Sequence, residues 1–364
     1  MYAFKRATIK QVAEQAGVST QTVSRVINAR PDVSPETRDR VQAVIDRLGY
    51  QPSAVARSLI GRRTHTIGVV GSGLEYYGPS RTLTGIEKQA AELGYSVLLV
   101  LIHEPETEDV GPVLADLRAR QVEGIIWAVP EIGGNHRWVR TLARPTVPIV
   151  FLSTEPQSDL PVVALANRTG GRLATEHLIA QGYRRIGLVT GPLTWWEARE
   201  RQVGWQDALI AAALPAEPRQ IVEGNWTAAS GEDAFARLRA QFPEFDAVVA
   251  SNDQMAQGLL HAAWTAGVRV PEDLGVVGFD DIPEAAYFIP PLTTMRQEST
   301  TLGGTALGVL HRLIAAWHET GRIATLESRW LQPELIVRKS SIAREPERAT
   351  RLAGLHETWD ATRD

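Results

Sequence analysis

The sequence predicts an α/β protein with an N-terminal head of three helices in a helix-turn-helix arrangement, a hinge helix, and a two-lobed body of doubly wound parallel sheets. Three observations lead to this prediction. Three amphipathic stretches with helix caps precede residue 50, and eight apolar runs alternate with amphipathic stretches after residue 65. The first 63 residues are basic, whereas the rest of the chain is acidic. With 364 residues, the chain is long enough for two or three domains.

Each helix of the head has its own start and stop signals. In the first, apolar residues at 9, 12, 13 and 16 follow the i, i+3, i+4, i+7 spacing of one helix face. The second and third helices have apolar faces at 23, 26 and 27 and at 41, 44, 45 and 48. The residues predicted to cap or end these helices are Thr8 with Gln11, Gly17, Ser19, Ser34 with Pro35, and Gly49.

The segment 50–63, YQPSAVARSLIGRR, differs from the head. It can form one short helix over 54–60, capped by Ser53 and ended by Gly61. A helix of about seven residues is not stable alone in water, so we expect it to order only when something packs on it. The predicted plan is therefore a head over 1–52, a hinge helix over 53–63, a body over 64–340 and a polar tail over 341–364 with at most a weak helix.

The body shows the pattern of a parallel α/β fold. Its apolar, β-rich runs lie at 66–70, 96–102, 124–129, 148–153, 162–166, 185–190, 245–250 and 274–279. Continuous apolar runs separated by helices indicate parallel strands buried on both faces. In such sheets ligands bind beyond the carboxyl ends of the strands, so we expect functional residues just after each run.

Composition excludes several classes of protein. The chain has no cysteine, which excludes disulfides, thiolate metal sites and cysteine catalysis and fits a reducing cytoplasm. The N-terminus has no signal-peptide pattern, and no run of about 18 apolar residues indicates a membrane span. Residues 1–63 carry 11 Lys and Arg against 5 Asp and Glu, a net charge of +6, whereas the remainder is at −10. A basic head on an acidic body predicts a polyanionic partner for the head.

The first two helices, joined through Gly17, form a helix-turn-helix pattern. The second helix has the length to lie in a DNA major groove about 12 Å wide. On its outer face, Gln21 and Arg25 can make paired hydrogen bonds to adenine and guanine edges. A generic three-helix bundle is the alternative that the pattern alone leaves open.

Longer motifs resolve this alternative through a family resemblance. The run TIKQVAEQAGVSTQTVSRVIN at 8–28 and the run VSPETRDRVQAVIDRLGYQPSAVARSLIG at 33–61 closely resemble the N-terminal signature of the lac repressor family. The resemblance covers nearly the whole chain up to about residue 340, and the body motifs are most similar to those of the member after which the family is named. It implies a DNA-binding transcription repressor whose body resembles periplasmic sugar-binding proteins and whose partners are a small effector and a second copy of the chain.

The resemblance also assigns DNA contacts. Thr20, Gln21 and Arg25 would read bases, although the family's namesake has a tyrosine in place of Thr20, so its operator is not carried over. Leu59, flanked by Ala56, would wedge into the central base step of a near-palindromic operator when two hinge helices meet over the minor groove. The residues assigned to phosphates are Ser19, Thr22, Ser24 and Asn28.

Body motifs such as GPLTWWEARERQVGW, EGNWTAASG, ASNDQMAQG and VVGFDDIPEAAYFIPPLTT follow predicted strands. By resemblance they supply an effector site in which Asp280 accepts hydrogen bonds from hydroxyls, Arg201 pairs with it and donates, and Trp226 covers the C–H face of a sugar ring. The effector residues expected are Arg201, Trp226, Asn252 and Asp280, completed by Ser72, Leu74, Pro79 and Ser153. The namesake has aspartate in place of Ser153, which leaves the identity of the sugar open.

Other functions fit the sequence less well. Adjacent carboxylates on a strand, Asp280 and Asp281, point to opposite faces and make a poor catalytic pair, so we expect no enzyme. The histidines show no metal-binding spacing, and no metal or cofactor is expected. A sugar-binding transport protein would need a secretion signal and no DNA-binding head. A corepressor-dependent regulator sensing a purine is the remaining alternative to a regulator induced by a galactoside or related sugar.

The expected assembly is a homodimer in the cytoplasm, associated with the nucleoid, that does not contact membranes. The tail 341–364 lacks the sustained heptads that a tetramer-forming zipper requires, so we expect association to stop at two copies.

Overall fold

The computed structural model describes residues 7–50, 63–107, 109–132, 135–138, 146–155, 160–322 and 328–342. Internal contacts divide the chain into two compact units, residues 1–65 and residues 66–364, and each is described by itself. The hinge helix predicted at 53–63, apart from Arg63, and the tail beyond residue 342 lie outside the described residues. In the described part of the chain, no helix has both the length and the apolar character that crossing a membrane requires.

The head consists of three helices, α1 (Ile9–Ala16), α2 (Thr20–Ile27) and α3 (Pro35–Leu48). The predicted caps are present in the structure. Thr8 and Gln11 form a reciprocal capping box, Ser19 and Ser34 accept hydrogen bonds from the first turns of α2 and α3, and Gly17 and Gly49 end their helices in the left-handed conformation. The apolar faces pack into one core that contains Val12, Val23, Val26, Val41 and Val44. The sequence pattern therefore predicted the head correctly.

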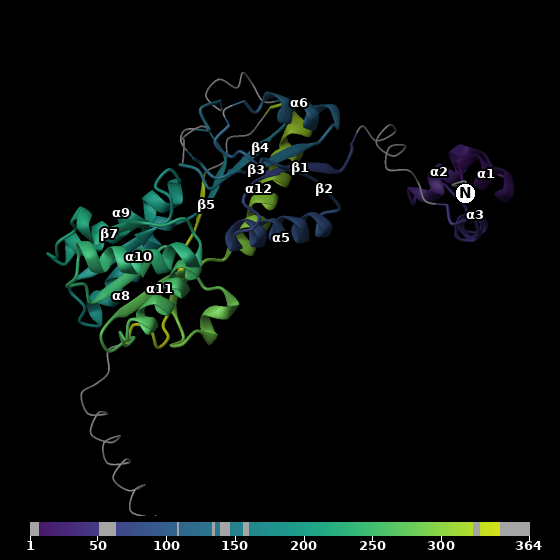
Figure 1. Cartoon of the computed structure of the whole chain (residues 1–364). Coiled ribbons are helices and arrows are strands. Elements are labelled where there is room, and N and C mark those ends of the chain that lie inside the picture. Colours follow the sequence, from purple (N-terminus) through teal and green to yellow (C-terminus); the bar gives the residue numbers. More distant parts are fainter. Residues whose placement is uncertain are drawn as a thin grey trace, which may run out of the picture. The chain divides into compact units, whose positions relative to one another are not determined.

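The first lobe of the body is a six-stranded sheet with helices on both faces (Figure 1). Its strand order is β11-β5-β4-β3-β1-β2, and the strands pair in parallel. The strands are β1 (Thr66–Gly71), β2 (Ser96–Leu101), β3 (Gly124–Ala128), β4 (Ile149–Leu152), β5 (Val162–Leu165) and β11 (Arg329–Leu331). The helices are α5 (Tyr77–Glu92), α6 (Gly111–Ala119) and α12 (Ser299–Thr320).

The second lobe repeats this plan with strand order β12-β10-β9-β8-β6-β7. Its strands are β6 (Ile186–Thr190), β7 (Ile221–Glu223), β8 (Ala247–Ala250), β9 (Gly275–Asp280), β10 (Thr293–Arg296) and β12 (Glu334–Ile336). Its helices are α8 (Asn167–Ala180), α9 (Trp196–Ala211), α10 (Ala228–Gln241) and α11 (Asp253–Thr265), with short 3₁₀ turns η1 (Pro218–Gln220) and η2 (Pro283–Tyr287). Among the described strands of this lobe, β12 alone pairs antiparallel, with β10, and the other pairs are parallel.

The chain passes between the lobes three times. It leaves the first lobe after β5, returns after β10 to place α12 against the first sheet, and crosses again between β11 and β12. Eight strands were expected from apolar runs, and all eight are present. The other four strands, β7, β10, β11 and β12, are short and lie in stretches that mix polar and apolar residues, so hydrophobicity gave no signal for them.

Candidate functional site

The outer face of α2 presents polar side chains to solvent. Thr20, Gln21 and Arg25 are exposed, whereas Val23 and Val26 on the opposite face are buried in the head core. Arg25 forms an ion pair with Asp32 at 3.5 Å, and both side chains remain about half exposed, at 55% each. An exposed ion pair of this kind is weak and exchanges readily for another partner. The three residues expected to read bases thus lie together on one accessible helix face.

The four residues expected to contact phosphates flank this face. Ser19 caps α2 and lies 3.0 Å from the hydroxyl of Thr22. Asn28 ends α2 and donates to the backbone oxygen of Ser24 at 2.8 Å. These contacts fix both ends of the helix and leave hydroxyl and amide groups at the surface. Ala56 and Leu59 lie outside the described residues.

The body contains a pocket that residues of both lobes line. All eight residues expected to bind an effector line this one pocket, namely Ser72, Leu74, Pro79, Ser153, Arg201, Trp226, Asn252 and Asp280. The first four come from the first lobe and the last four from the second. The structure therefore brings together every side chain of the predicted set, although they are spread over more than 200 positions.

Asp280 ends β9 and faces the pocket. Its backbone has a φ of 111°, which residues other than glycine rarely adopt. Gln297 donates its side-chain amide to Asp280 Oδ1 at 2.6 Å. Although the residue is partly exposed to the cavity, protein surrounds its carboxyl group, and burial raises the pKa to about 6 against the opposing effects of Arg201 and Gln297. A carboxylate held in this way can accept hydrogen bonds strongly.

Arg201 is buried on α9, and its partners differ from those expected. The expected pairing with Asp280 is wrong as a direct contact: the guanidinium donates to Asn167 Oδ1 at 2.8 Å and to the backbone oxygen of Ser251. Burial lowers the pKa of Arg201, and the negative charge of Asp280 partly offsets that effect. These two hydrogen bonds use two of the five N–H groups of the side chain, which leaves donors for a ligand.

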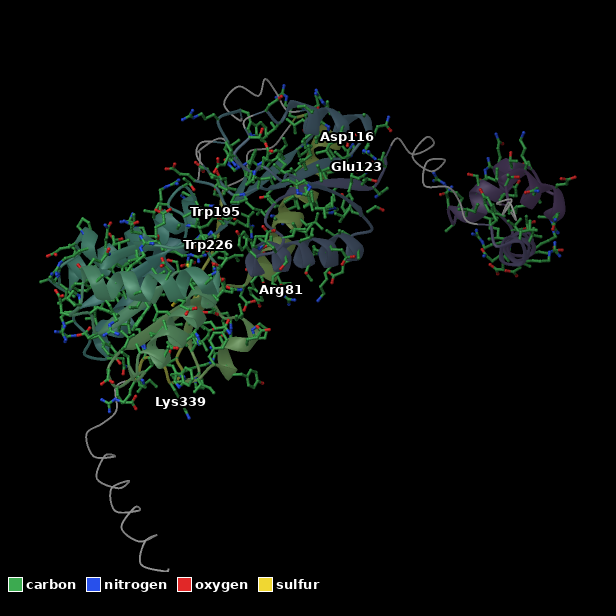
Figure 2. All side chains as sticks on the ribbon, viewed as in Figure 1. Arg81, Asp116, Glu123, Trp195, Trp226 and Lys339 are labelled. Atoms are coloured by element: carbon green, nitrogen blue, oxygen red, sulfur yellow. The ribbon has the colours of Figure 1, made fainter. Side chains whose placement is uncertain are left out.

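Aromatic rings form one wall of the pocket. Trp226, Trp195 and Tyr76 make successive edge-on contacts, with ring centroids 5.8 Å apart between the two tryptophans and 6.0 Å apart between Trp195 and Tyr76. Figure 2 labels the two tryptophans, which lie close together in the second lobe. Gly191 lies under the Trp226 ring, and a Cβ there would collide with the indole. The Trp226 face expected from the sequence is therefore part of a larger apolar surface that joins both lobes.

Glu197 is a pocket residue that sequence reasoning missed. It lies in the first turn of α9 and lines the pocket together with Ser153 from the other lobe, which lowers the pKa of Glu197 against the effect of burial. Burial raises the pKa of Glu197. Oε2 of this carboxylate is buried and has no hydrogen-bond partner in the described residues. An acidic group therefore stands beside Ser153, the position at which the family's namesake has aspartate.

Unpartnered polar atoms gather around the pocket. In the described residues, buried side-chain atoms without a partner include Glu197 Oε2, Gln254 Oε1, Gln297 Oε1 and Trp226 Nε1, and all four residues line the pocket. Buried polar groups are normally hydrogen-bonded, because an unsatisfied group loses its hydration without compensation. Three of these atoms are acceptors and one is a donor.

The three missed residues do not stand at the end of a predicted strand, where we expected functional residues. Glu197 and Gln254 lie in the first turns of α9 and α11, and Gln297 follows β10, a strand that has no apolar run. The motif TWWE placed before Arg201 was a usable signal for Glu197, since it puts a carboxylate one helical turn from a predicted site residue. No group of three or more acidic or histidine side chains in the described residues is arranged to hold a metal ion.

A basic helix-turn-helix head and a two-lobed body with an inter-lobe pocket define a ligand-responsive DNA-binding regulator. The model of bacterial regulatory proteins of the lacI family matches residues 8–53, and the model of the periplasmic binding protein-like domain matches residues 175–341. The lactose operon repressor of Escherichia coli (strain K12) is 34% identical over 93% of this chain and 92% of its own. The ribose operon repressor of the same strain is 38% identical over 84% and 93%.

A further relative and two solved structures are also transcription regulators similar to this chain over most of its length. The transcriptional repressor PurR of Haemophilus influenzae (strain Rd) is 35% identical over 92% of this chain and 98% of its own. The crystal structure of the lac repressor dimer bound to operator and the anti-inducer ONPF has a TM-score of 0.85 at 34% identity, covering 93% of this chain and 100% of that one. The complex of the transcriptional regulator CelR with cellobiose has a TM-score of 0.68 at 31% identity, covering 92% and 100%.

The chain belongs to the lacI family of bacterial regulatory proteins. It is a DNA-binding transcription repressor with an effector-binding body, and not an enzyme, because its relatives over nearly the whole length are transcription repressors. The expectations about family, fold class and general function are confirmed.

Proposed function

We propose that this repressor is released from its operator by a small sugar, a galactoside or a related saccharide. The observation that carries the proposal is the composition of the pocket. An aromatic wall offers apolar faces for the C–H side of a sugar ring, while Glu197, Gln254, Gln297 and Asp280 supply acceptors for its hydroxyls. Sugars combine many O–H donors with apolar ring faces, so they satisfy both requirements.

Relatives support a saccharide in general terms. The names of two of them refer to the lactose and ribose operons, and a third was solved with cellobiose. A nucleobase is the alternative that the sequence left open, and a relative named PurR keeps it among the compounds to test. A planar base has fewer donors than a sugar has hydroxyls, so it would leave more of the pocket acceptors unpaired.

A panel of compounds separates these effectors. The thermal unfolding midpoint of the full chain would be measured with lactose, methyl β-galactoside, cellobiose, ribose, hypoxanthine and guanine. A compound that binds the folded state raises the midpoint, because it adds RT ln(1 + [L]/Kd) to the stability. We expect a saccharide, and a galactoside first, to raise it. A shift with hypoxanthine or guanine and with no sugar would contradict the proposal.

We further propose that the chain acts on DNA as a homodimer in the cytoplasm. One reading helix covers only half of a near-palindromic site, and the hinge sequence is too short to be helical alone, so two copies are needed for a specific complex. Thr20, Gln21 and Arg25 read bases in this proposal, whereas Ser19, Thr22, Ser24 and Asn28 hold phosphates. Light scattering at micromolar concentration should give the mass of a dimer. The mass of a tetramer would contradict the expectation that association stops at two copies.

The proposed mechanism uses the two lobes. A ligand between them shifts their arrangement only if it binds one arrangement more tightly than the other. Ser72 and Pro79 belong to the first lobe, while Arg201 and Asp280 belong to the second, so one ligand contacts both. Ligand binding would then release the operator by separating the paired hinges at 53–63.

A further inference from the structure

The turn after β9 holds an unfavourable backbone conformation. Asp280 and Asp281 have φ angles of 111° and 53°, and both lie in the region that favours glycine. Such conformations persist only where the surrounding structure holds them, and they concentrate at functional sites. The conformation aims Asp280 into the pocket, so whatever holds the turn also sets the position of that carboxylate.

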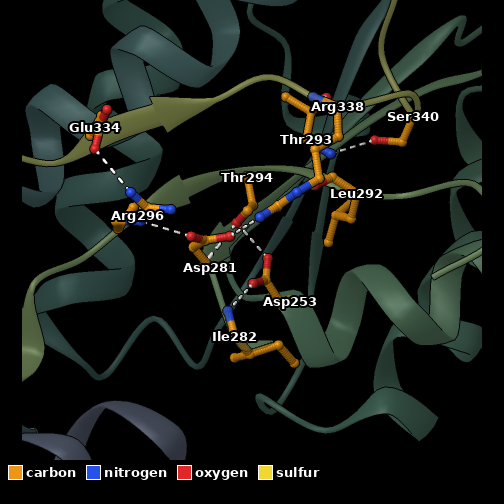
Figure 3. A network of polar contacts seen from close by, with 10 residues as sticks. All are labelled: Asp253, Asp281, Ile282, Leu292, Thr293, Thr294, Arg296, Glu334, Arg338 and Ser340. Atoms are coloured by element: carbon orange, nitrogen blue, oxygen red, sulfur yellow. Dashed lines mark hydrogen bonds and ion pairs between the residues drawn. The ribbon is translucent and has the colours of Figure 1, made fainter. Parts of the chain in front are cut away.

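The side chain of Asp253 holds the turn after β9 through two hydrogen bonds. Its side chain is fully buried, and it does not line the pocket. Oδ1 accepts a hydrogen bond from the Thr294 hydroxyl at 2.6 Å, and Oδ2 accepts one from the backbone N–H of Ile282 at 2.9 Å (Figure 3). The same Thr294 oxygen accepts the N–H of Asp281 at 3.3 Å. One carboxylate therefore ties the two residues that follow Asp280 to the neighbouring strand.

The structure leaves space for this carboxylate. Gly278, in β9, lies directly against it, and a Cβ at that position would collide with Asp253 Oδ1. The side chain of Asp281, the next residue of the turn, accepts hydrogen bonds from Arg296 at 2.8 Å and from Arg338 at 2.6 Å (Figure 3). The turn is thus fixed on two sides, and Asp280 is the member whose side chain turns to the cavity.

Asp253 is also linked to two other pocket residues. It follows Asn252, the N-cap of α11, whose side chain accepts from the Met255 N–H and donates to the Trp226 backbone oxygen, each at 2.9 Å. Movement of the first turn of α11 would therefore move Asn252 and the backbone that carries Trp226. Asp253 therefore connects the turn that carries Asp280 to the first turn of α11, and Asn252 extends this connection to the backbone of Trp226.

We propose that Asp253 is a positioning residue of the effector site, which does not touch the ligand and sets the place of the Asp280 carboxylate through Thr294 and Ile282. This inference rests on the proposed function, since it concerns the residue through which the sugar would be recognised. It goes beyond that function because it assigns ligand affinity to a side chain outside the pocket.

The first test needs no ligand. Crystal structures of the full-length Asp253→Ala and Asp253→Asn variants would be compared with that of the unchanged protein. Asparagine can still accept from the Ile282 N–H and can donate to the Thr294 hydroxyl, so it should keep the turn, whereas alanine should let the Asp280 carboxylate leave Gln297. If Asp280 keeps its place in Asp253→Ala, the proposal is overturned. If Asp253→Ala does not fold, Thr294→Val removes the same hydroxyl link and should displace Asp280 in the same way.

The second test is a double-mutant cycle measured by calorimetry with lactose, methyl β-galactoside, cellobiose and ribose. Asp253→Ala should raise the Kd of the bound sugar by at least about tenfold, and by less than about twofold in an Asp280→Asn background. Asp253→Asn should restore affinity, and Asp273→Ala, on the exposed ion pair with Arg269, should have no effect. Equal losses in both backgrounds would show that Asp253 does not act through Asp280. If no sugar binds the unchanged protein, the proposed function fails, while the crystal structures still decide the positioning role.

Discussion

Ser153 and Glu197 line the same pocket from different lobes of the body, and Ser153 lowers the pKa of Glu197 against the larger effect of burial. Ser153 follows β4 of the first sheet, whereas Glu197 lies in the first turn of α9 in the second lobe. Nearby, the backbone N–H of Trp196 donates to the oxygen of Glu131 at 3.1 Å, again across the lobes. The protein therefore joins its lobes at the wall where the effector is expected to bind.

Replacement of Glu197 tests whether this wall recognises the effector. Glu197→Met keeps an unbranched side chain of similar length and removes both acceptors. A buried hydrogen bond to a charged group contributes about 1.5–3 kcal/mol, so sugar affinity should fall by roughly tenfold or more. The measurement is calorimetric titration with the sugar that binds the unchanged protein.

Glu200→Met is the matched control, because Glu200 lies one turn further along α9 and does not line the pocket. It should retain the affinity of the unchanged protein. If the two variants bind the sugar equally well, Glu197 is not part of the recognition surface.

The ionised carboxylate of Asp280 should lower the free energy of unfolding in the absence of ligand. Burial raises its pKa from the ordinary 3.8 to about 6, so the folded state binds the proton more tightly than the unfolded chain does. By linkage, the free energy of unfolding falls as pH rises through the window from about 3.8 to about 6, and the cost is complete above it. Asp280→Asn, whose amide oxygen can still accept from Gln297, should stabilise the protein at pH 7 by about 1–3 kcal/mol.

Urea unfolding of both proteins between pH 4.5 and pH 7.5 measures this effect, and the gain from Asp280→Asn should shrink toward the acidic end. Asp273 is a control of opposite sign, and it requires the measurements to be extended to about pH 2. Its hydrogen bond from Arg269 lowers the pKa of that carboxyl from 3.8 to about 2, so its contribution to stability is lost as pH falls from about 3.8 to about 2. A variant Asp280→Asn that is less stable than the unchanged protein at every pH would contradict the conclusion that the buried Asp280 charge destabilises the ligand-free protein.

Arg25 should determine sequence preference in DNA binding. It is exposed on the reading face of α2, with only a surface partner in Asp32. Arg25→Ala should cost about 1–3 kcal/mol and relax the preference at one symmetric base position. Affinities for the operator, for single-base variants and for random DNA at fixed salt provide the measurement.

Arg47→Ala, which removes the same charge from α3, where Arg47 donates to Gln15, should leave the preference unchanged. A uniform loss on all DNA for Arg25→Ala would assign Arg25 to a phosphate contact instead.

Leu59 should matter only for the specific complex. Its position lies outside the described residues, and its proposed role is to wedge between central bases when two hinges pair. Leu59→Ala should therefore weaken operator binding and leave binding to random DNA nearly intact. Ala56→Ser is a milder change next to it that should be tolerated. Equal losses on operator and random DNA would remove the wedge from the proposal.

Local signals in the sequence were sufficient for the head and for most of the body. Caps such as Thr8, Ser19 and Ser34 act within one turn of their helices, so their effect can be predicted without tertiary structure. The central strands are buried on both faces and are therefore apolar throughout. Edge strands such as β7 and β12 form because a neighbour offers free hydrogen-bonding groups, which no local pattern records.

The candidate site was predictable where a residue follows an apolar strand. Asp280 ends such a strand, Ser153 comes directly after another and Asn252 lies two residues beyond a third, and the sequence predicted all three as pocket residues. The partners of Arg201 were not, because Asn167 and Ser251 are distant in sequence and meet it only through the packing of α8, β8 and α9. The strained conformation at Asp280 depends on Asp253 and Thr294, so it belongs to the fold as a whole.

The most direct test of the central claim is operator affinity measured with and without a saturating sugar, for the unchanged protein and for Asp280→Ala. The sugar should weaken operator binding by the unchanged protein. Asp280→Ala should bind the operator with the same affinity and should no longer respond to the sugar, because Arg201 stays hydrogen-bonded to Asn167 while the pocket loses the carboxylate of Asp280. A sugar that tightens operator binding, or a variant that keeps the full response, would contradict the account.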